Sequence, residues 1–210
     1  MRESPPRVRH LCNAIAIVAS CIVIHPAAAQ SAPDYIAPDV QFMQGMIYHH
    51  AQAVAMADWA HTHGASQSVT LFCKKVALTQ EGEIKLMQQW LLDRHLAAPD
   101  PLGYLHHDTA AMNMPGMSKG AMDMTGHMMP GMLTPDQMAL LDASTGATFD
   151  RFFLTFMIQH HEGALGMVQA LFDAGGGQQA DLFAFANNVQ ADQSAEIRVM
   201  QGMLSAYTKE

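Results

Sequence analysis

The feature that most constrains this chain is an internal duplication. Residues 39–56 recur as residues 150–167 at a constant offset of 111, with Asp, Phe, Met-Ile, His-His, Ala and Met kept in register. Residues 76–87 recur as residues 189–200 at an offset of 113, with Val, Gln, Glu-Ile and Met kept. The two-residue difference falls in the turns between these segments, so each repeat is predicted to be one unit of two paired segments.

The spacing inside each repeat is that of a helix. Apolar residues and histidines recur three or four positions apart, as in Phe42, Met46, His49, Ala53 and Met56. Asp39 is the candidate N-cap of the first helix, and Gly64 lies where that helix would end. No alternating strand pattern competes, so we predict an all-α four-helix bundle built from two duplicated helical hairpins.

The remaining boundaries follow from helix start and stop signals. The second helix is predicted over 67–95, the third over 147–174 and the fourth over 178–207, and Thr134 with Pro135 starts a short additional helix. The chain is therefore divided into repeat 1 (about 39–98), a Met/His-rich insert (about 99–133) and repeat 2 (about 134–207), within a single domain covering 30–210.

The first 29 residues have the pattern of a secretory signal peptide. A basic start precedes an apolar run over 11–24, and three alanines precede the predicted cleavage after Ala29. The apolar run is too short to span a membrane comfortably, so a periplasmic or secreted protein without a membrane span is expected. A lipoprotein attached at Cys21 is the less favoured alternative. Cys73 is then the sole cysteine of the mature chain, and we interpret it as a small buried helix residue, in preference to a ligand or a dimer bridge.

Composition points to metal ions as partners. Eleven basic residues against 19 acidic ones give a formal net charge of −8, which argues against a nucleic-acid partner. Met and His are abundant instead, at 18 and 12 residues. Thioether and imidazole are the ligands that soft and intermediate metal ions prefer.

The repeated Met-x-x-His-His motif places one Met and two His within a single helical turn. In a two-fold arrangement both sets would face the bundle interior or flank one mouth of it, with a repeated Glu on the partner helices as ligand or as hydrogen-bond acceptor for His. The alternative is that these residues are ordinary core. The predicted ligands in the bundle are Met46, His49, His50, Met56, Glu83, Met157, His160, His161, Met167 and Glu196.

The insert between the repeats carries the most specific metal signal. From His106 to Met132 it holds eight Met and three His but no Leu, Ile, Val, Phe, Tyr or Trp. A segment that needed only hydrophobicity would use several apolar types, so sulfur itself is selected; a Met-biased linker is the alternative. Thioethers suit Cu(I) or Ag(I). The predicted ligands here are Met112, Met114, Met117, Met122, Met124, His127, Met128, Met129 and Met132.

The doubled motifs resemble those of the bacterial family called domain of unknown function 305. The pattern Phe-x-x-x-Met-Ile-x-His-His-x-x-Ala-x-x-Met, followed by Gln-x-x-Glu-Ile-x-x-Met, is present in both repeats. The resemblance implies a ferritin-like bundle, export from the cytoplasm and, for some members, copper binding and copper tolerance. The long insert departs from the family pattern and leaves open whether the bundle or the insert is the main site.

The leading hypothesis is a non-enzymatic periplasmic copper-binding protein that sequesters or transfers Cu(I), in exchange with other periplasmic copper-handling proteins. Ag(I) and Cu(II) are the alternative ions. A ferritin-like metal-dependent oxidase is disfavoured because Glu-x-x-His on single helices is missing from both repeats. A structural or interaction bundle without metal is the third hypothesis. The oligomeric state is left open.

Overall fold

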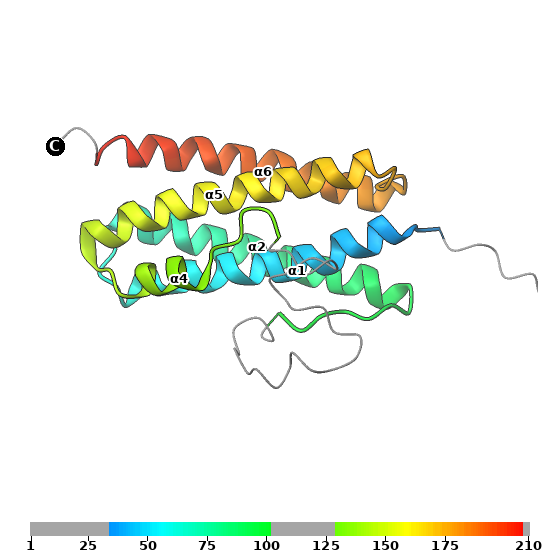
Figure 1. Cartoon of the computed structure of the whole chain (residues 1–210), viewed down its shortest axis with the longest axis horizontal. Coiled ribbons are helices and arrows are strands. Elements are labelled where there is room, and N and C mark those ends of the chain that lie inside the picture. Colours follow the sequence, from blue (N-terminus) through cyan, green and yellow to red (C-terminus); the bar gives the residue numbers. More distant parts are fainter. Residues whose placement is uncertain (1–33, 102–128, 208–210) are drawn as a thin grey trace, which may run out of the picture. The chain divides into compact units, whose positions relative to one another are not determined.

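The computed structural model describes residues 34–101 and 129–207, and these residues fold into helices with no strand among them (Figure 1). The prediction of an all-α fold is confirmed, and the second, third and fourth long helices agree with their predicted bounds to within three residues, whereas the first ends at Asp58 and is followed by a 3₁₀ turn before Gly64. The elements are α1 (Ala37–Asp58), a 3₁₀ turn (Trp59–His61), α2 (Gln67–Asp93), α4 (Pro135–Asp142), α5 (Gly146–Asp173) and α6 (Ala180–Leu204). The predicted signal peptide lies outside the described residues.

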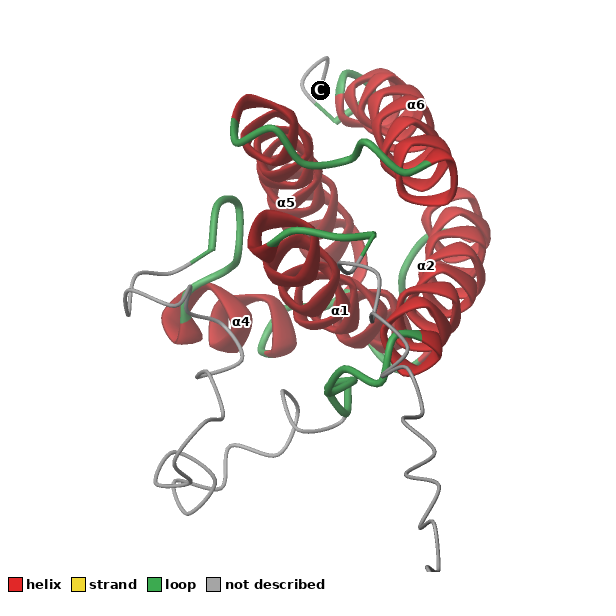
Figure 2. Cartoon of the chain, turned by 90° about the vertical axis from the view of Figure 1, so that its right-hand side faces the viewer, coloured by secondary structure: helices red, strands yellow, loops and turns green. Residues whose placement is uncertain are grey.

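The long helices form two hairpins. α1 packs along α2, α5 packs along α6, and the hairpins meet mainly through α1 and α5 (Figure 2). The short helix α4 lies against α5. Thr134 caps α4 as predicted: its hydroxyl accepts the Gln137 N–H, while the Gln137 side chain accepts the Thr134 N–H at 2.9 Å.

The two repeated aspartates join the hairpins crosswise. The buried Asp39 carboxylate accepts the Gly177 N–H at 2.7 Å in the α5–α6 turn. The equivalent Asp150 accepts the Ser66 N–H at 3.2 Å in the α1–α2 turn, and also the Tyr207 hydroxyl at 2.5 Å. Each carboxylate therefore holds the turn of the opposite hairpin, and the duplication produces a two-fold-related pair of clamps.

The prediction that Asp39 is the N-cap of the first helix is wrong. The helix begins at Ala37 after Ile36, and the Asp39 carboxylate reaches back to accept the Ile36 N–H at 2.9 Å. Pro38 explains the difference. A proline is favoured in the first turn of a helix, where its missing N–H has no partner to lose, so the helix starts before Asp39.

The apolar core is divided into two clusters along the bundle. The first cluster includes Phe42, Met46, Met87 and Leu182, and the second includes Met56, Phe153, Met157 and Met200. On each long helix the residues of one cluster give way to those of the other near the middle of the helix. The buried histidines and glutamines of the two repeats lie between the residues of the two clusters on these helices.

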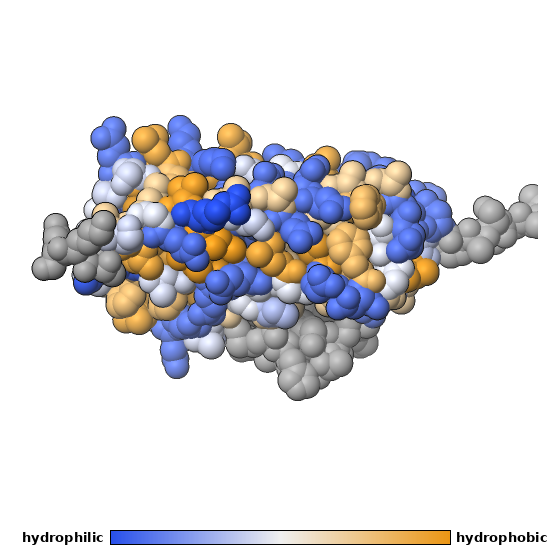
Figure 3. Space-filling model, turned by 90° about the horizontal axis from the view of Figure 1, so that it is seen from above, coloured by the Kyte–Doolittle hydropathy of each residue, from blue (hydrophilic) through white to orange (hydrophobic). Residues whose placement is uncertain are grey.

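The surface interleaves hydrophilic and hydrophobic residues on the face shown in Figure 3. Large apolar side chains are exposed singly along α2 and α6, for example Leu78 and Phe183, which is ordinary for a folded domain. Of the helices that the structure describes, none combines the length and the apolar character that crossing a membrane requires. Cys73 is buried on α2 within the second cluster, as interpreted from the sequence, and burial raises the pKa of its thiol.

Candidate metal centre

A layer of polar side chains crosses the bundle between the two apolar clusters, and we call it the histidine layer. Its four histidines are fully buried, its two glutamines are nearly so, and every member has a partner at the equivalent position of the other repeat. The histidine layer comprises His49, His50, Gln80, Glu83, His160, His161, Gln193 and Glu196. A buried polar atom without a partner costs about 1–3 kcal/mol, and the four histidines and two glutamines of the layer all carry such atoms, so their burial requires a reason beyond packing.

Each repeat contributes one His–Glu pair that joins its two helices. His50 Nε2 lies 2.7 Å from Glu83 Oε2, and His161 Nε2 lies 2.8 Å from Glu196 Oε2. Burial acts to raise the pKa of Glu196, but the hydrogen bond and charge of His161, with Lys75 Nζ at 3.3 Å, outweigh it and hold that pKa below its usual value. Glu196 is thus ionised and accepts the imidazole N–H.

The other two histidines meet at the centre of the bundle. The rings of His49 and His160 have centroids 3.8 Å apart and planes inclined by 39°. Burial, reinforced by the charge of the neighbouring His50, lowers the pKa of His49 to about 3. Burial and the neighbouring histidines, His49 first among them, hold the pKa of His160 well below its usual value. Both central rings are therefore neutral at physiological pH, which is the state in which imidazole binds metal ions.

The hydrogen bonds of the layer select one tautomer and leave a lone pair inside the bundle. His49 Nε2 donates to the Pro130 carbonyl at 3.0 Å, so the proton of this neutral ring is on Nε2. The lone pair on Nδ1 is therefore inside the bundle without a hydrogen-bond donor. Nδ1 of all four histidines has no hydrogen-bond partner, and His160 Nε2 makes no hydrogen bond of normal geometry either. A ring whose one nitrogen donates to a carboxylate or carbonyl while the other is available is the usual arrangement of a histidine ligand.

The methionines lie on both sides of the histidine layer. Met46 belongs to the first apolar cluster and Met157 to the second, and both are fully buried. Met56 is fully buried in the second cluster, whereas Met167 is partly exposed beside the first. Of the two arrangements predicted for the Met-His-His motifs, the structure has the one in which they face the bundle interior.

Most predicted ligands of the insert lie outside the described residues, namely Met112, Met114, Met117, Met122, Met124, His127 and Met128. Met129 and Met132 are described, and both are buried against the bundle. Met129 lies close to α1: a Cβ added at Gly45 would be 3.4 Å from Met129 Sδ and 3.5 Å from the terminal methyl of Met167. The structure therefore brings one thioether of the insert beside one of the bundle.

The layer does not have the geometry of a finished metal site. Within residues 34–101 and 129–207, no three His, Cys, Asp or Glu side chains are grouped so as to hold an ion. The rings form a row from His50 through His49 and His160 to His161, with centroid separations of 6.5, 3.8 and 6.3 Å. The His49 and His160 rings pack against each other at a tilt of 39°, and in the described part of the chain no third ligand of these types is grouped with them.

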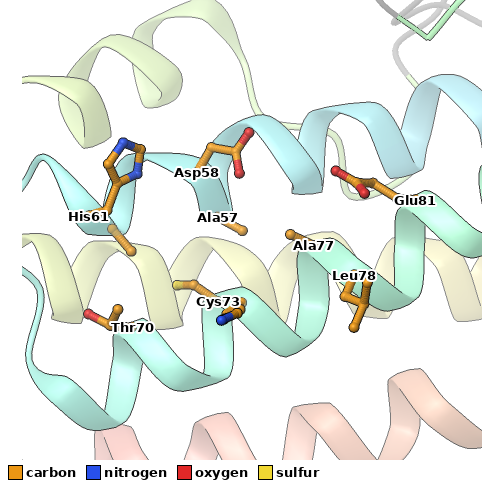
Figure 4. A pocket seen from close by; sticks show the side chains of 10 residues that line it. Ala57, Asp58, His61, Thr70, Cys73, Ala77, Leu78 and Glu81 are labelled. Carbon is orange, nitrogen blue, oxygen red and sulfur yellow. The ribbon is translucent and has the colours of Figure 1, made fainter.

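A separate groove of about 350 Å³ runs along the outer side of the first hairpin. Figure 4 shows Asp58, His61 and Glu81 along one edge of it and Cys73 with Thr70 and Leu78 along the other. None of the residues of the histidine layer lines this groove. It is therefore not part of the candidate centre.

Gln52 and Gly163, which hold the backbone of residues 130–133, were not identified from the sequence. Gln52 holds the backbone of Leu133, and Gly163 contacts the backbone at Pro130 and Gly131. A signal was present, because Gln52 and Gly163 occupy the same position of the two repeats. A polar residue and a glycine at one repeat position indicate that the two-fold relation is broken there.

Comparison with known proteins identifies the family of this chain. The chain belongs to the family described as Domain of unknown function (DUF305), whose model matches residues 39–204. There is no significant match among curated proteins.

Solved structures with the same fold include a DUF305 protein from Streptomyces coelicolor, at 23% identity and a TM-score of 0.63, covering 80% of this chain and 93% of that one. A DUF305 fragment from Deinococcus radiodurans is 25% identical with a TM-score of 0.64, over 83% of this chain and 99% of that one. CopM in its Cu(II)-bound form is 22% identical with a TM-score of 0.58, over 80% and 97%.

Proposed function

We propose that this protein binds copper as cargo, with Cu(I) favoured, and that it sequesters or transfers the ion. The observation that carries the proposal is the set of four buried Nδ1 atoms without a partner, three of them on rings whose Nε2 is held by a carbonyl or a carboxylate. Methionine thioethers lie on both sides of that layer. Imidazole with thioether is a donor set for Cu(I) and Ag(I) and a poor one for Mg²⁺ or Ca²⁺.

The comparisons support the choice of ion. CopM, which shares the fold, has been solved in Cu(I)-bound, Cu(II)-bound and Ag-bound forms. We propose two classes of site in the present chain: the histidine layer, flanked by Met46, Met56, Met157 and Met167, and the methionines of the insert. In the layer we assign Glu83 and Glu196 to orienting His50 and His161, because their carboxylates hold Nε2 of those rings.

The proposed location is the periplasm or the exterior of the cell. One support is the predicted signal peptide over residues 1–29. The other is the DUF305 protein from Streptomyces coelicolor, which is described as a candidate secreted protein. A thioether is a neutral donor for Cu(I) at any pH, whereas a thiol must first lose its proton to become a ligand.

The test is native mass spectrometry of the chain 30–210 titrated with Cu(I) under reducing conditions. Three versions are compared: the natural sequence, an insert variant with leucine at methionines 112, 114, 117, 122, 124 and 128, and a layer variant with glutamine at the four layer histidines. We expect more than one ion on the natural chain, fewer on the insert variant, and loss of the most tightly held ion from the layer variant. Absence of Cu(I) from the natural chain at micromolar concentration would refute the proposal.

A further inference from the structure

The last residues of the insert, just before α4, are hydrogen-bonded to α1 at and near the histidine layer. We call residues 129–133 the strap, and it runs alongside α5 before α4 begins (Figure 1). Its Pro130 carbonyl accepts the His49 Nε2–H at 3.0 Å. The Gln52 side chain accepts the Leu133 N–H at 2.8 Å and donates to the Leu133 carbonyl at 3.1 Å. The strap is thus bonded directly to one of the two central histidines.

Two glycines allow the strap to lie against α5. A Cβ at Gly163 would overlap the Pro130 carbonyl group and lie 2.5 Å from Gly131 Cα. A Cβ at Gly131 would lie 2.7 Å from the Gln159 carbonyl and 2.8 Å from the His160 carbonyl, and Gly131 has a φ of +76°. The strap therefore rests on the backbone of the second central histidine as well.

This contact breaks the two-fold relation of the centre. The two repeats differ at the position that contacts the strap. In α5 this position is Gly163, whose backbone touches the strap, and in α1 it is Gln52, whose side chain hydrogen-bonds to the strap. His49 Nε2 is occupied by the strap, while the equivalent nitrogen of His160 makes no hydrogen bond of normal geometry. Equivalent positions of the two repeats, Gln52 and Gly163, thus both contact the strap but do so in different ways.

We propose that the strap gates access of the metal ion to the central histidine pair, with Met129 and Met167 as the thioether pair that captures the ion first. Met129 is carried by the strap itself and approaches Met167 over Gly45. Lifting the strap frees His49 Nε2 and uncovers the layer, and the ion passes from the thioethers to the imidazoles. This gate rests on the proposed function, since it assigns an order of steps to the same site.

The structure offers a matched pair of variants to test the gate. Gly163→Ala places a methyl group where the Pro130 carbonyl lies, whereas Gly166→Ala, three residues further along α5, has nothing within 4 Å of its new Cβ. Both changes give α5 the same gain in helix propensity, about 1 kcal/mol, so a difference between them reports the strap. Gln52→Ala is a third variant, which loosens the strap at Leu133 without steric overlap.

The first measurement uses no metal. Diethyl pyrocarbonate modifies accessible neutral imidazoles, and mass spectrometry of peptides reads the rate at His49 and His160. We expect modification about tenfold faster in G163A and in Q52A than in G166A, because each loses interactions that hold the strap closed. Equal rates in the variants, with helical content and melting temperature retained, would overturn the gate.

The second measurement is the association rate of Ag(I) by stopped flow. We expect faster association in G163A than in G166A, slower association in Met129→Leu, and no effect of Met129→Leu once Gly163→Ala is also present. Faster histidine modification with an unchanged Ag(I) rate would overturn the gate but not the proposed function. No Ag(I) uptake by the natural chain would overturn both, whatever the modification rates show.

Discussion

At the scale of single residues, burial fixes the charge state of the two central histidines. His49 and His160 lie between apolar clusters, where a charged imidazolium would lose its hydration without gaining a carboxylate. His50 and His161 lie at the same depth, but each has a glutamate. The layer thus contains two kinds of histidine, distinguished by their partners and not by their exposure.

Acidification is expected to destabilise the fold in the range where histidine normally titrates. The pKa values of His49 and His160 are depressed in the folded chain, so below about pH 6.5 the unfolded chain takes up protons that the folded chain cannot. Stability is full above that pH and falls as the pH is lowered toward the folded-state values. Melting temperatures at pH 7.5 and 5.5 measure this, and a His49→Gln, His160→Gln double variant with an equally steep loss would contradict it.

Removing the partner of one imidazole is expected to weaken metal binding without removing a ligand. Glu83→Ala leaves His50 free to rotate, and loss of such an orienting partner typically costs about 10- to 100-fold in metal affinity. Glu81→Ala, an exposed change of the same kind on the same helix, is the control and is expected to change affinity little. Competition titration with a Cu(I) chelator measures both; equal affinities would argue against the orienting role.

At the scale of elements, the duplication produces hairpins that fasten each other. Asp39 and Asp150 lie in the first helix of each hairpin and hold the turn of the other hairpin. The four long helices were predictable from the 3–4 spacing and the proline and glycine signals. The exact start of α1 was not, because Pro38 moved the cap to Ile36 and freed Asp39 for a long-range bond to Gly177.

Loss of either clamp is expected to destabilise the bundle by about 1–3 kcal/mol, since each leaves a backbone N–H of a turn unpaired. The variants are Asp39→Ala and Asp150→Ala, and the exposed Asp192→Ala on α6 is the control, expected within about 0.5 kcal/mol of the natural chain. Urea unfolding gives the free energies. Clamp variants as stable as D192A would show that the crosswise bonds contribute nothing to holding the hairpins together.

At the scale of the whole molecule, a polar layer divides the core into two apolar clusters. The repeat motifs indicated the four histidines of the interior, which recur at an offset of 111, and the two glutamates beside them, which recur at an offset of 113. They could not predict that His49 turns toward His160 while the adjacent His50 turns toward Glu83, nor that Pro130 contacts His49 across 81 positions of sequence. Those directions depend on the packing of helices and on the strap.

A bound soft cation is expected to stabilise the bundle. An ion that binds only the folded chain adds about 2.7 kcal/mol at a concentration of 100 times its dissociation constant, which for a domain of this size is a rise in Tm of roughly 5–10 °C. Calorimetry with Ag(I) measures the rise, with Mg²⁺ as the hard-cation control that leaves Tm unchanged. A variant with glutamine at the four layer histidines should show little rise; a rise equal to that of the natural chain would place the stabilising ion elsewhere.

The most direct test of the central claim reads the ring nitrogens themselves. In a long-range ¹H–¹⁵N spectrum of the histidines, added Ag(I) should move the Nδ1 resonances of the layer histidines while the Nε2 resonances of His50 and His161 keep the shift of a protonated nitrogen. If saturating Ag(I) moves only methionine methyl signals and leaves every layer histidine unchanged, the buried imidazoles are structural and the histidine layer is not a metal centre.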